Sequence, residues 1–294
     1  MQTIRVSYPI QKSVQLQSEP CVMALGFFDG VHLGHQEIIK TARAEAERKG
    51  LKLAVMTFSP HPSVVIKKGK QINEYITPIF EKEKIFEKLR VDFLYVVDFN
   101  EEVARIPHQD FVDDFLCGLQ CEHAVAGFDY TYGFKGQGTM DQLKVDAKAR
   151  FAVTVVSKKE KNQQKISSTL LRELITSGRV ERVPSYLGKS YKIEGELYND
   201  GNKTFIEVVD DYLLPCSGTY EVSVRRGIFH EKAVCEVTKL GQKRCLEVYG
   251  LQSEAVFTGE TVHLQWHNFI ADPQNYPFHV QSTIDEFEAL SVSV

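Results

Sequence analysis

Long apolar segments and paired cysteines are both missing from this sequence. No stretch of the 294 residues is apolar over the length that crosses a bilayer, and the first 18 residues, MQTIRVSYPIQKSVQLQS, contain no signal-peptide core. The six cysteines are scattered without a CxxC pair, which favours free thiols over a disulfide framework or a zinc site. We therefore expect a cytoplasmic protein with no membrane partner.

An excess of positive charge is missing as well. The formal net charge is -4, so the sequence offers no general basic field, and we expect no nucleic-acid partner. Any anionic ligand must then be held by a focused site. The share of hydrophobic residues (43%) and of charged residues (25%) is typical of a globular protein, and the length predicts two domains.

The sequence does contain a regular alternation of apolar runs and helix-like segments. Five short runs, VMALGF, LKLAVMTF, FLYVV, HAVAGF and FAVTVV, lie between residues 22 and 156 and alternate with segments rich in Glu, Lys and Ala. This alternation is typical of βαβ units, so we predict an α/β domain with a parallel sheet. Helix starts are predicted at Thr77-Pro78, ahead of IFEKEKIFEKL, and at Ser167 or Ser168, ahead of LLRELITS.

The pattern changes after Gly178. Residues 180–191, VERVPSYLGKSY, are interpreted as a linker. Six short alternating segments separated by Gly, Asn and Asp follow: YKIEGELYN, KTFIEVVD, GTYEVSVRRG, KAVCEVTK, KRCLEVYG and GETVHLQWHNF. They are typical of a small antiparallel barrel or sandwich. We therefore predict one domain over residues 1–183 and a second over residues 187–294.

Two histidines stand at the first strand-to-helix turn, in GFFDGVHLGHQE over residues 26–37. A helix is predicted from Gln36 to Lys49, ending at Gly50. In a parallel sheet this turn lies at the carboxyl ends of the strands, near the point where strand order reverses and ligands bind. Gly34 allows a close approach, helix N–H groups attract an anion, and the imidazoles of His32 and His35 can donate hydrogen bonds to phosphate. Exposed turn residues and a histidine pair that binds zinc are the alternatives.

The same residues resemble a known family. GFFDGVHLGHQ is similar to the HxGH signature of the nucleotidyltransferase superfamily, and FDGVHLGHQ resembles the prokaryotic bifunctional riboflavin kinase/FAD synthetases. TFSPHP (57–62), GFDYTYGFKGQG (127–138) and ISSTLLRELI (166–175) match further family stretches in the same order. The resemblance implies a Rossmann-like nucleotidyltransferase domain followed by a kinase-like β-barrel.

The resemblance also implies a role for each matched stretch. His32, His35 and Arg172 would be catalytic. The phosphates of ATP would be held by Gly26, Phe27, Asp29, Gly34, Ser167, Ser168 and Thr169. The flavin of FMN would be held by Pro60, His61, Pro62, Asp129, Tyr130 and Tyr132. Magnesium would bridge phosphate oxygens, with Asp129 as a candidate partner.

These stretches have chemistry of their own. ISST gathers hydroxyl and N–H groups at a helix start, with Arg172 one turn on, although an N-cap and a solvated arginine explain the pattern too. The Pro-His-Pro turn suits a flat ring, or is only a rigid surface loop. Tyr130 and Tyr132 stand where the family usually has phenylalanines, and they suit a ring system or a protein core equally well.

The second half departs from the family. LGKSYKIEGELYNDG and LLPCSGTYEVSV are similar to the riboflavin kinase module, yet the intervening GRxLGFPTAN is absent, and NDGNKTFIEVVDDYLLP stands there. In the family the Thr and Asn of PTAN help to hold magnesium and nucleotide. Glu247 falls near the family's catalytic glutamate, or is an outward strand residue. The tail, residues 271–294, lacks the family's closing helix pattern.

We therefore predict an FAD synthetase that transfers AMP from ATP to FMN, giving FAD and pyrophosphate, with a degenerate barrel that has no riboflavin kinase activity. A bifunctional enzyme with a diverged kinase loop is one alternative. An adenylyltransferase for another phosphorylated metabolite and a non-enzymatic flavin or nucleotide sensor are the others.

Overall fold

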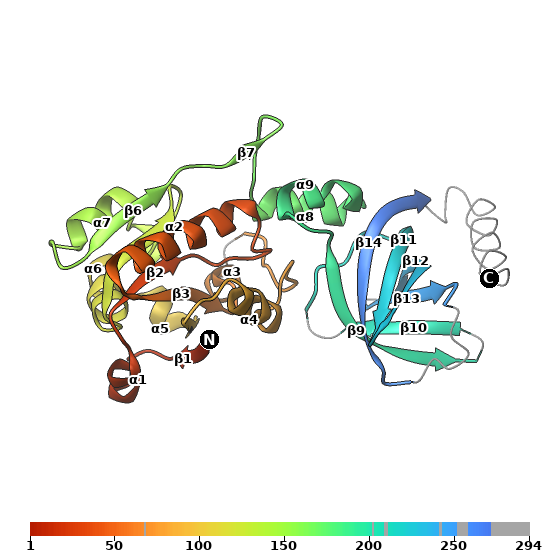
Figure 1. Ribbon diagram of the computed structural model, residues 1–294, viewed down its shortest axis with the longest axis horizontal. Coiled ribbons are helices and arrows are strands. Elements are labelled where there is room, and N and C mark those ends of the chain that lie inside the picture. The colour runs from red at the N-terminus through yellow and green to blue at the C-terminus, as the bar shows by residue number, and fades with distance from the viewer. Residues whose placement is uncertain (68, 202, 209–210, 241–242, 252–257, 272–294) are drawn as a thin grey trace. The chain divides into compact units, whose positions relative to one another are not determined.

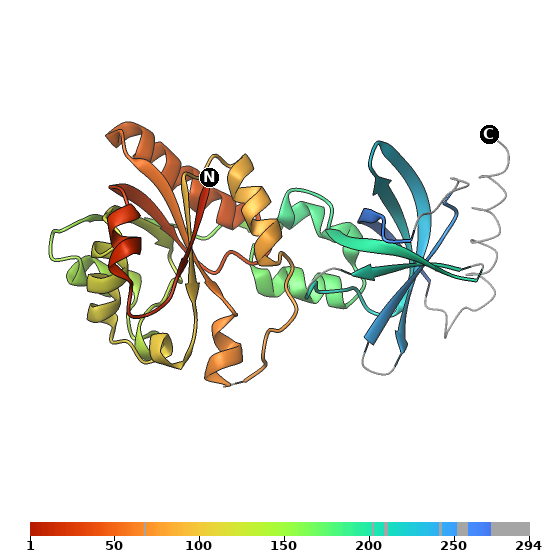
Figure 2. The same ribbon diagram turned by 90° about the horizontal axis from the view of Figure 1, so that it is seen from below.

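The computed structural model describes residues 1–67, 69–201, 203–208, 211–240, 243–251 and 258–271. The chain divides into two compact units, Met1–Ile166 and Ser167–Val294 (Figures 1 and 2). The first is an α/β unit and the second carries a barrel, so the predicted fold class is confirmed.

A six-stranded parallel sheet forms the centre of the first unit, in the order β1-β4-β3-β2-β5-β6. Strand order reverses at β2, because β3 and β4 lie on one side of it and β5 and β6 on the other. The predicted apolar runs form β2 to β6, whereas β1, a short edge strand beside β4, was not predicted. The strands are β1 (Gln2–Val6), β2 (Cys21–Leu25), β3 (Lys52–Ser59), β4 (Phe93–Asp98), β5 (Cys121–Gly127) and β6 (Ala152–Val156).

Helices cover both faces of this sheet (Figure 1). Apolar residues of α2 and α4 pack on one face, and those of α6, η1 and α7 pack on the other. A small hairpin of β7 (Glu160–Lys161) and β8 (Gln164–Lys165) follows β6. The helices are α1 (Lys12–Gln17), α2 (Leu33–Lys49), α3 (Pro62–Ile66), α4 (Ile79–Lys88), α5 (Glu101–Ala104), α6 (His108–Phe111), the π-helical η1 (Val112–Cys117), the 3-10 turn η2 (Phe134–Gly136) and α7 (Met140–Asp146).

Two helix starts differ from the prediction. Helix α2 begins at Leu33, three residues early, because His32 acts as its N-cap; it ends as predicted at Gly50, which is left-handed with φ 67°. Helix α4 has Pro78 as its N-cap, and the N–H of Thr77 is instead bonded to Asp29.

The second unit is a closed six-stranded barrel preceded by short helices. Its strand order is β10-β13-β12-β11-β14-β9, with all strand pairs antiparallel. All six predicted segments form strands, and the barrel rather than the sandwich is observed. The elements are α8 (Ser168–Thr176), the 3-10 turn η3 (Val180–Arg182), α9 (Pro184–Leu187), β9 (Lys192–Asp200), β10 (Lys203–Val208), β11 (Gly218–Arg226), β12 (Phe229–Leu240), β13 (Lys243–Tyr249) and β14 (Thr261–Ala271).

The predicted linker is wrong. Residues 180–187 form η3 and α9, and Val180, Val183, Tyr186 and Leu187 are buried. Their spacing of three and four residues is helical, and η3 packs on β14. The domain limits at 183 and 187 stay a prediction. The tail, residues 272–294, lies outside the described residues.

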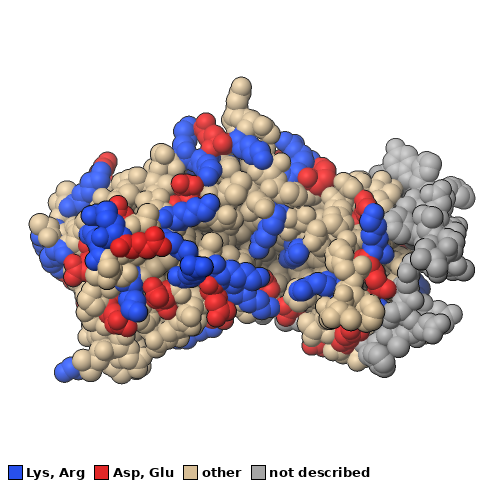
Figure 3. Space-filling model, viewed as in Figure 1, with Lys and Arg blue, Asp and Glu red and all other residues tan. Residues whose placement is uncertain are grey.

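Two further features concern the charge on the surface and the apolar character of the helices. Basic and acidic side chains are intermixed on the face shown in Figure 3. Within the described ranges, no helix has both the length and the apolar character needed to cross a membrane.

Candidate active site

The turn after β2 lies at the carboxyl end of the sheet, where strand order reverses. Its backbone is unusual, because Phe28 and Val31 have positive φ values of 57° and 44°, and Gly30 has φ 85°. Such conformations are costly for residues other than glycine and are retained where the surrounding structure holds them. A hydrogen bond from the Val31 N–H to the Phe28 carbonyl, at 3.2 Å, closes the turn.

His32 and His35 form a stacked pair at the start of α2. Nδ1 of His32 accepts a hydrogen bond from the N–H of His35 at 3.1 Å, so the ring itself caps the helix. The two ring centroids lie 3.6 Å apart with an interplanar angle of 14°. Because Nδ1 of His32 is an acceptor, the proton of the neutral ring is on Nε2, which is then available as a donor.

Both imidazoles are held neutral. Burial lowers the pKa of His32 from 6.5 to about 4. The pKa of His35 is also well below its usual value, first through burial, then through repulsion from His32 whenever that ring is protonated, and then through the positive charge of Lys82. Among the described residues, Nδ1 of His35 has no hydrogen-bond partner. At neutral pH the pair therefore offers donors to an anion without carrying net charge.

Gly34 brings a second predicted stretch close to this pair. A Cβ atom on Gly34 would lie 3.1 Å from Cε1 of His32 and 3.7 Å from the carbonyl oxygen of Ile166. Ile166 is bonded to Ser167, which caps α8 by accepting the N–H of Leu170 at 3.2 Å, as predicted. The last residue of the first unit, Ile166, therefore lies near the histidine turn (residues 26–35), and the rest of the ISST stretch follows it in the chain.

The other predicted phosphate residues have varied surroundings. Ser168 and Thr169 form the first turn of α8, and the half-buried Arg172 follows one turn later in the second unit. Asp29 is 3% exposed, and one of its oxygens accepts the N–H of Thr77 at 3.1 Å. A Cβ atom on Gly26 would lie 3.0 Å from the Phe28 ring, so a larger residue there would press on that ring.

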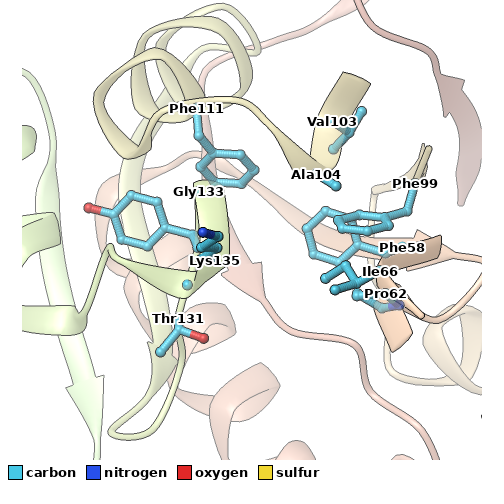
Figure 4. A pocket seen from close by; sticks show the side chains of 12 residues that line it. Phe58, Pro62, Ile66, Phe99, Val103, Ala104, Phe111, Thr131, Gly133 and Lys135 are labelled. Atoms are coloured by element: carbon cyan, nitrogen blue, oxygen red, sulfur yellow. The ribbon is translucent and has the colours of Figure 1, made fainter. Parts of the chain in front are cut away.

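An apolar pocket of about 180 Å³ opens in the first unit (Figure 4). It joins two predicted flavin stretches, since Pro62 comes from the Pro-His-Pro turn and Tyr132 from the GFDYTYG loop. The remaining lining residues are Phe58, Ile66, Phe99, Val103, Ala104, Phe111, Thr131, Gly133, Lys135 and Gly136. Pro60, His61, Asp129 and Tyr130 are not among the residues that line it.

Of the predicted flavin residues, His61 and Asp129 have polar partners of their own. Nδ1 of His61 accepts the N–H of Ser63 at 3.1 Å, which caps α3, and its ring meets the Phe27 ring edge-on at 4.4 Å. Asp129 is 56% exposed and pairs with Lys165 at 2.5 Å. His61 thus connects the Pro-His-Pro turn to the histidine turn.

The two tyrosines stack with centroids 6.2 Å apart. The hydroxyl of Tyr132 donates to the buried Asp146 at 2.7 Å, and the same carboxylate oxygen lies 2.6 Å from Nδ1 of His108. The amide of Gln142 donates to the other oxygen at 2.7 Å. Tyr132 is therefore held by a satisfied buried network, and burial raises its pKa.

Comparison with known proteins identifies the family of this chain. A sequence model of FAD synthetase matches residues 14–170, more than half of the chain. The chain belongs to the FAD synthetase family. The resemblance of the four motifs is confirmed, and the chain is an enzyme of the nucleotidyltransferase class.

Relatives of this family match nearly the whole chain. A bifunctional riboflavin kinase/FMN adenylyltransferase of Listeria monocytogenes is 40% identical over 282 residues, covering 92% of this chain and 90% of the relative. The protein of that name from Bacillus subtilis is 34% identical over 291 residues, covering 94% and 92%. An FAD synthetase of Listeria monocytogenes is 35% identical over 205 residues, covering 69% and 81%.

One solved structure, that of a macrolide-efflux protein from Streptococcus pneumoniae, shares the fold. It superposes with a TM-score of 0.83 at 24% identity, and the match covers 98% of this chain and 99% of that chain.

The family's kinase segment is replaced by a hairpin in this chain. Strand β9 turns at Gly201 directly into β10, which pairs with it. Glu247 on β13 is 12% exposed at its side chain and pairs with Lys203 at 2.8 Å. Hydrogen bonding to Glu247 raises the pKa of Lys203. Glu247 thus lies on the outer face of β13, between the buried Leu246 and Val248, and it has a counter-charge in Lys203.

Sequence reasoning missed part of the site. Phe99 and Phe111 line the pocket but stood outside the matched motifs. A signal existed for Phe99, because it lies two residues after the predicted strand FLYVV and so falls near the carboxyl edge of the sheet. No sequence signal marked Lys82, whose ammonium is buried beside Phe27.

Proposed function

We propose that this chain is an FMN adenylyltransferase. A phosphate oxygen of FMN attacks the α-phosphorus of ATP, the bond from that phosphorus to the β-phosphate oxygen breaks, and FAD and pyrophosphate leave. The observation that carries the proposal is the neutral, stacked pair of His32 and His35 at the N-terminus of α2, in the same unit as an apolar, aromatic-lined pocket. One site offers phosphate donors and the other a surface for a flat ring.

The chemistry requires positioning and charge stabilisation rather than a protein nucleophile. His32 donates from Nε2, and His35 lies against it, so both act on oxygens whose charge grows in the transition state. The N–H groups at the start of α2 add to this field. Ser167, Ser168, Thr169 and Arg172 hold the ATP phosphates and the leaving pyrophosphate, since they combine N-terminal donors of a helix with a guanidinium group.

The pocket takes the flavin ring. Its walls of Phe58, Phe99, Phe111 and Tyr132 suit a planar aromatic system, and the Pro-His-Pro turn contributes Pro62. Asp129 is the predicted partner for magnesium, since its carboxylate is 56% exposed after β5, and it would have to exchange its pairing with Lys165 for the metal. Magnesium would neutralise phosphate charge and retain most of its waters.

We further propose that the barrel has no riboflavin kinase activity. The PTAN segment is absent, and the ammonium of Lys203 is bonded to Glu247, where a carboxylate that serves a metal or a hydroxyl proton would need to be free. The bifunctional names of the two relatives that match nearly the whole chain favour the opposite outcome. The two possibilities give different products.

The test is a chromatographic product assay with the full chain, ATP and magnesium, offered either FMN or riboflavin. We expect FAD from FMN and no flavin product from riboflavin. Appearance of FMN from riboflavin would refute the loss of kinase activity while leaving adenylyl transfer standing. Absence of FAD from FMN would refute the adenylyltransferase itself and favour a binding protein or another phosphorylated substrate.

A further inference from the structure

Lys82 on α4 is a buried lysine next to the histidine turn. It is 2% exposed, whereas Lys84 on the same helix has 47% of its side chain exposed. The ammonium of Lys82 donates to the carbonyl oxygen of Phe27 at 2.7 Å and lies 3.9 Å from the centroid of the Phe27 ring. Thr57 donates to the same carbonyl at 2.8 Å. A buried ammonium is costly, so its placement needs a reason.

This carbonyl sets the direction of a backbone donor. The peptide bond between Phe27 and Phe28 is trans and planar, so its C=O and N–H point in opposite directions. With the carbonyl turned to Thr57 on β3 and to Lys82 on α4, the N–H of Phe28 points away from both. Strand β2 has β5 as its other neighbour, and the reversal of strand order between them is where the phosphates are expected.

The turn needs such restraint. Phe28 has φ 57°, a conformation that a bulky residue keeps only under constraint from its surroundings. Its ring is fully buried and meets the His35 ring edge-on at 5.2 Å, so a change at the peptide reaches the histidine pair. The ring of Phe27 meets His61 in the same way at 4.4 Å. Through Phe27, Lys82 is therefore in contact with the histidine turn and, one residue further, with the Pro-His-Pro turn.

We infer that Lys82 is a positioning residue for adenylyl transfer: it holds the Phe27–Phe28 peptide with the Phe28 N–H directed to the phosphates of ATP and keeps His35 seated. This rests on the proposed function. We assign Lys82 a positioning role rather than direct contact with substrate because it is 2% exposed and its ammonium bonds to the Phe27 carbonyl. Its positive charge also favours the neutral form of His35.

The experiment compares Lys82→Met with Lys84→Met in the full chain. A donor to a transition-state oxyanion is worth about 100-fold or more in turnover, and for a residue acting through the backbone we expect a loss of about 10-fold to 100-fold in kcat/KM for ATP. The thermal midpoint of each variant is measured alongside, so that the kinetics compare folded proteins. Lys84→Met should match the parent protein.

Thr57→Val supplies a second, independent test. It removes the other donor to the same carbonyl, so we expect a loss of about 10-fold, and the double variant should lose less than the product of the two single losses because both act on one group. If Lys82→Met does not fold, the kcat/KM of Thr57→Val alone tests whether the Phe27 carbonyl must be held. Turnover of the folded variants within twofold of the parent, or losses that multiply, would overturn the inference.

A direct binding measurement separates this inference from the proposed function. If the parent protein makes no FAD, the proposed function fails, and calorimetry with ATP still tests Lys82. We then expect Lys82→Met to bind ATP about 10-fold more weakly. Unchanged affinity would overturn the inference.

Discussion

Replacing His32 with asparagine should remove a pH dependence of stability. In the folded protein, burial lowers the pKa of His32 to about 4, whereas in the unfolded chain it returns to 6.5. Below pH 6.5 the unfolded chain takes up a proton that the folded chain refuses, so stability falls as the pH falls. Asparagine cannot titrate, and its side-chain oxygen can still accept the N–H of His35 as a helix cap.

The size of the effect follows from the shift. Each unit of pKa difference is worth about 1.4 kcal/mol, so the shift of His32 makes the free energy of unfolding about 3 kcal/mol lower at pH 4 than at pH 7. The loss is complete once the pH lies below the folded pKa, and stability is nearly constant above pH 6.5. The His32→Asn variant should lack this contribution, while His35 is retained in both proteins.

The assay is urea unfolding of both proteins at pH 7, 6, 5 and 4, followed by circular dichroism. Trp266 supplies the control, because it lies in the barrel of the second unit, whereas His32 lies in the first. Unfolding followed by Trp266 fluorescence should therefore show the same pH dependence in the parent and in the variant. The difference in unfolding free energy between parent and variant should change by about 3 kcal/mol from pH 7 to pH 4. Curves that stay parallel within about 0.5 kcal/mol would refute the neutral, buried state of His32.

Three further predictions concern the reaction. His35→Ala should lower kcat by about 100-fold or more, as loss of a transition-state donor does, and near-normal turnover would remove His35 from the mechanism. Arg172→Ala should weaken ATP binding while FMN binding stays unchanged; an unaltered ATP affinity measured by calorimetry would contradict its phosphate role. Ala104→Phe should fill part of the 180 Å³ pocket and raise the KM for FMN by about 10-fold, with the KM for ATP constant, and an equal rise in both would place the flavin elsewhere.

The sequence predicted the architecture well because its hydrophobic periodicities are clear. Continuous apolar runs mark β2 to β6 as parallel strands, of which β2 to β5 are largely buried and β6 is an exposed edge, and alternating segments mark the barrel. Strand β1 was not predicted because only two of its residues, Ile4 and Val6, are buried, so the strand is short and mostly polar. The segment over residues 180–187 was misjudged because its proline and charges obscured a helical spacing.

The candidate site could be predicted where a local motif carries it. The histidine turn, the cap at Ser167 and the pocket residues Pro62 and Tyr132 fall within short, ordered matches. Phe111 and Lys82 could not be found in this way. A phenylalanine or a lysine in an amphipathic helix shows no sign of which neighbour it faces until the helices are packed.

The Tyr132 network changes how a departure from the family pattern should be judged. The ring of Tyr132 faces the pocket, while its hydroxyl is bound by Asp146, which does not line the pocket. A ligand in this pocket would therefore meet the surface that a phenylalanine would present, because the extra oxygen is bonded within the protein. Phenylalanine at position 132 would remove one of the donors to the buried carboxylate of Asp146, so we expect it to be tolerated better when residue 146 changes as well. The choice of tyrosine or phenylalanine at position 132 thus bears on how the pocket wall is supported and not on the surface that the wall presents.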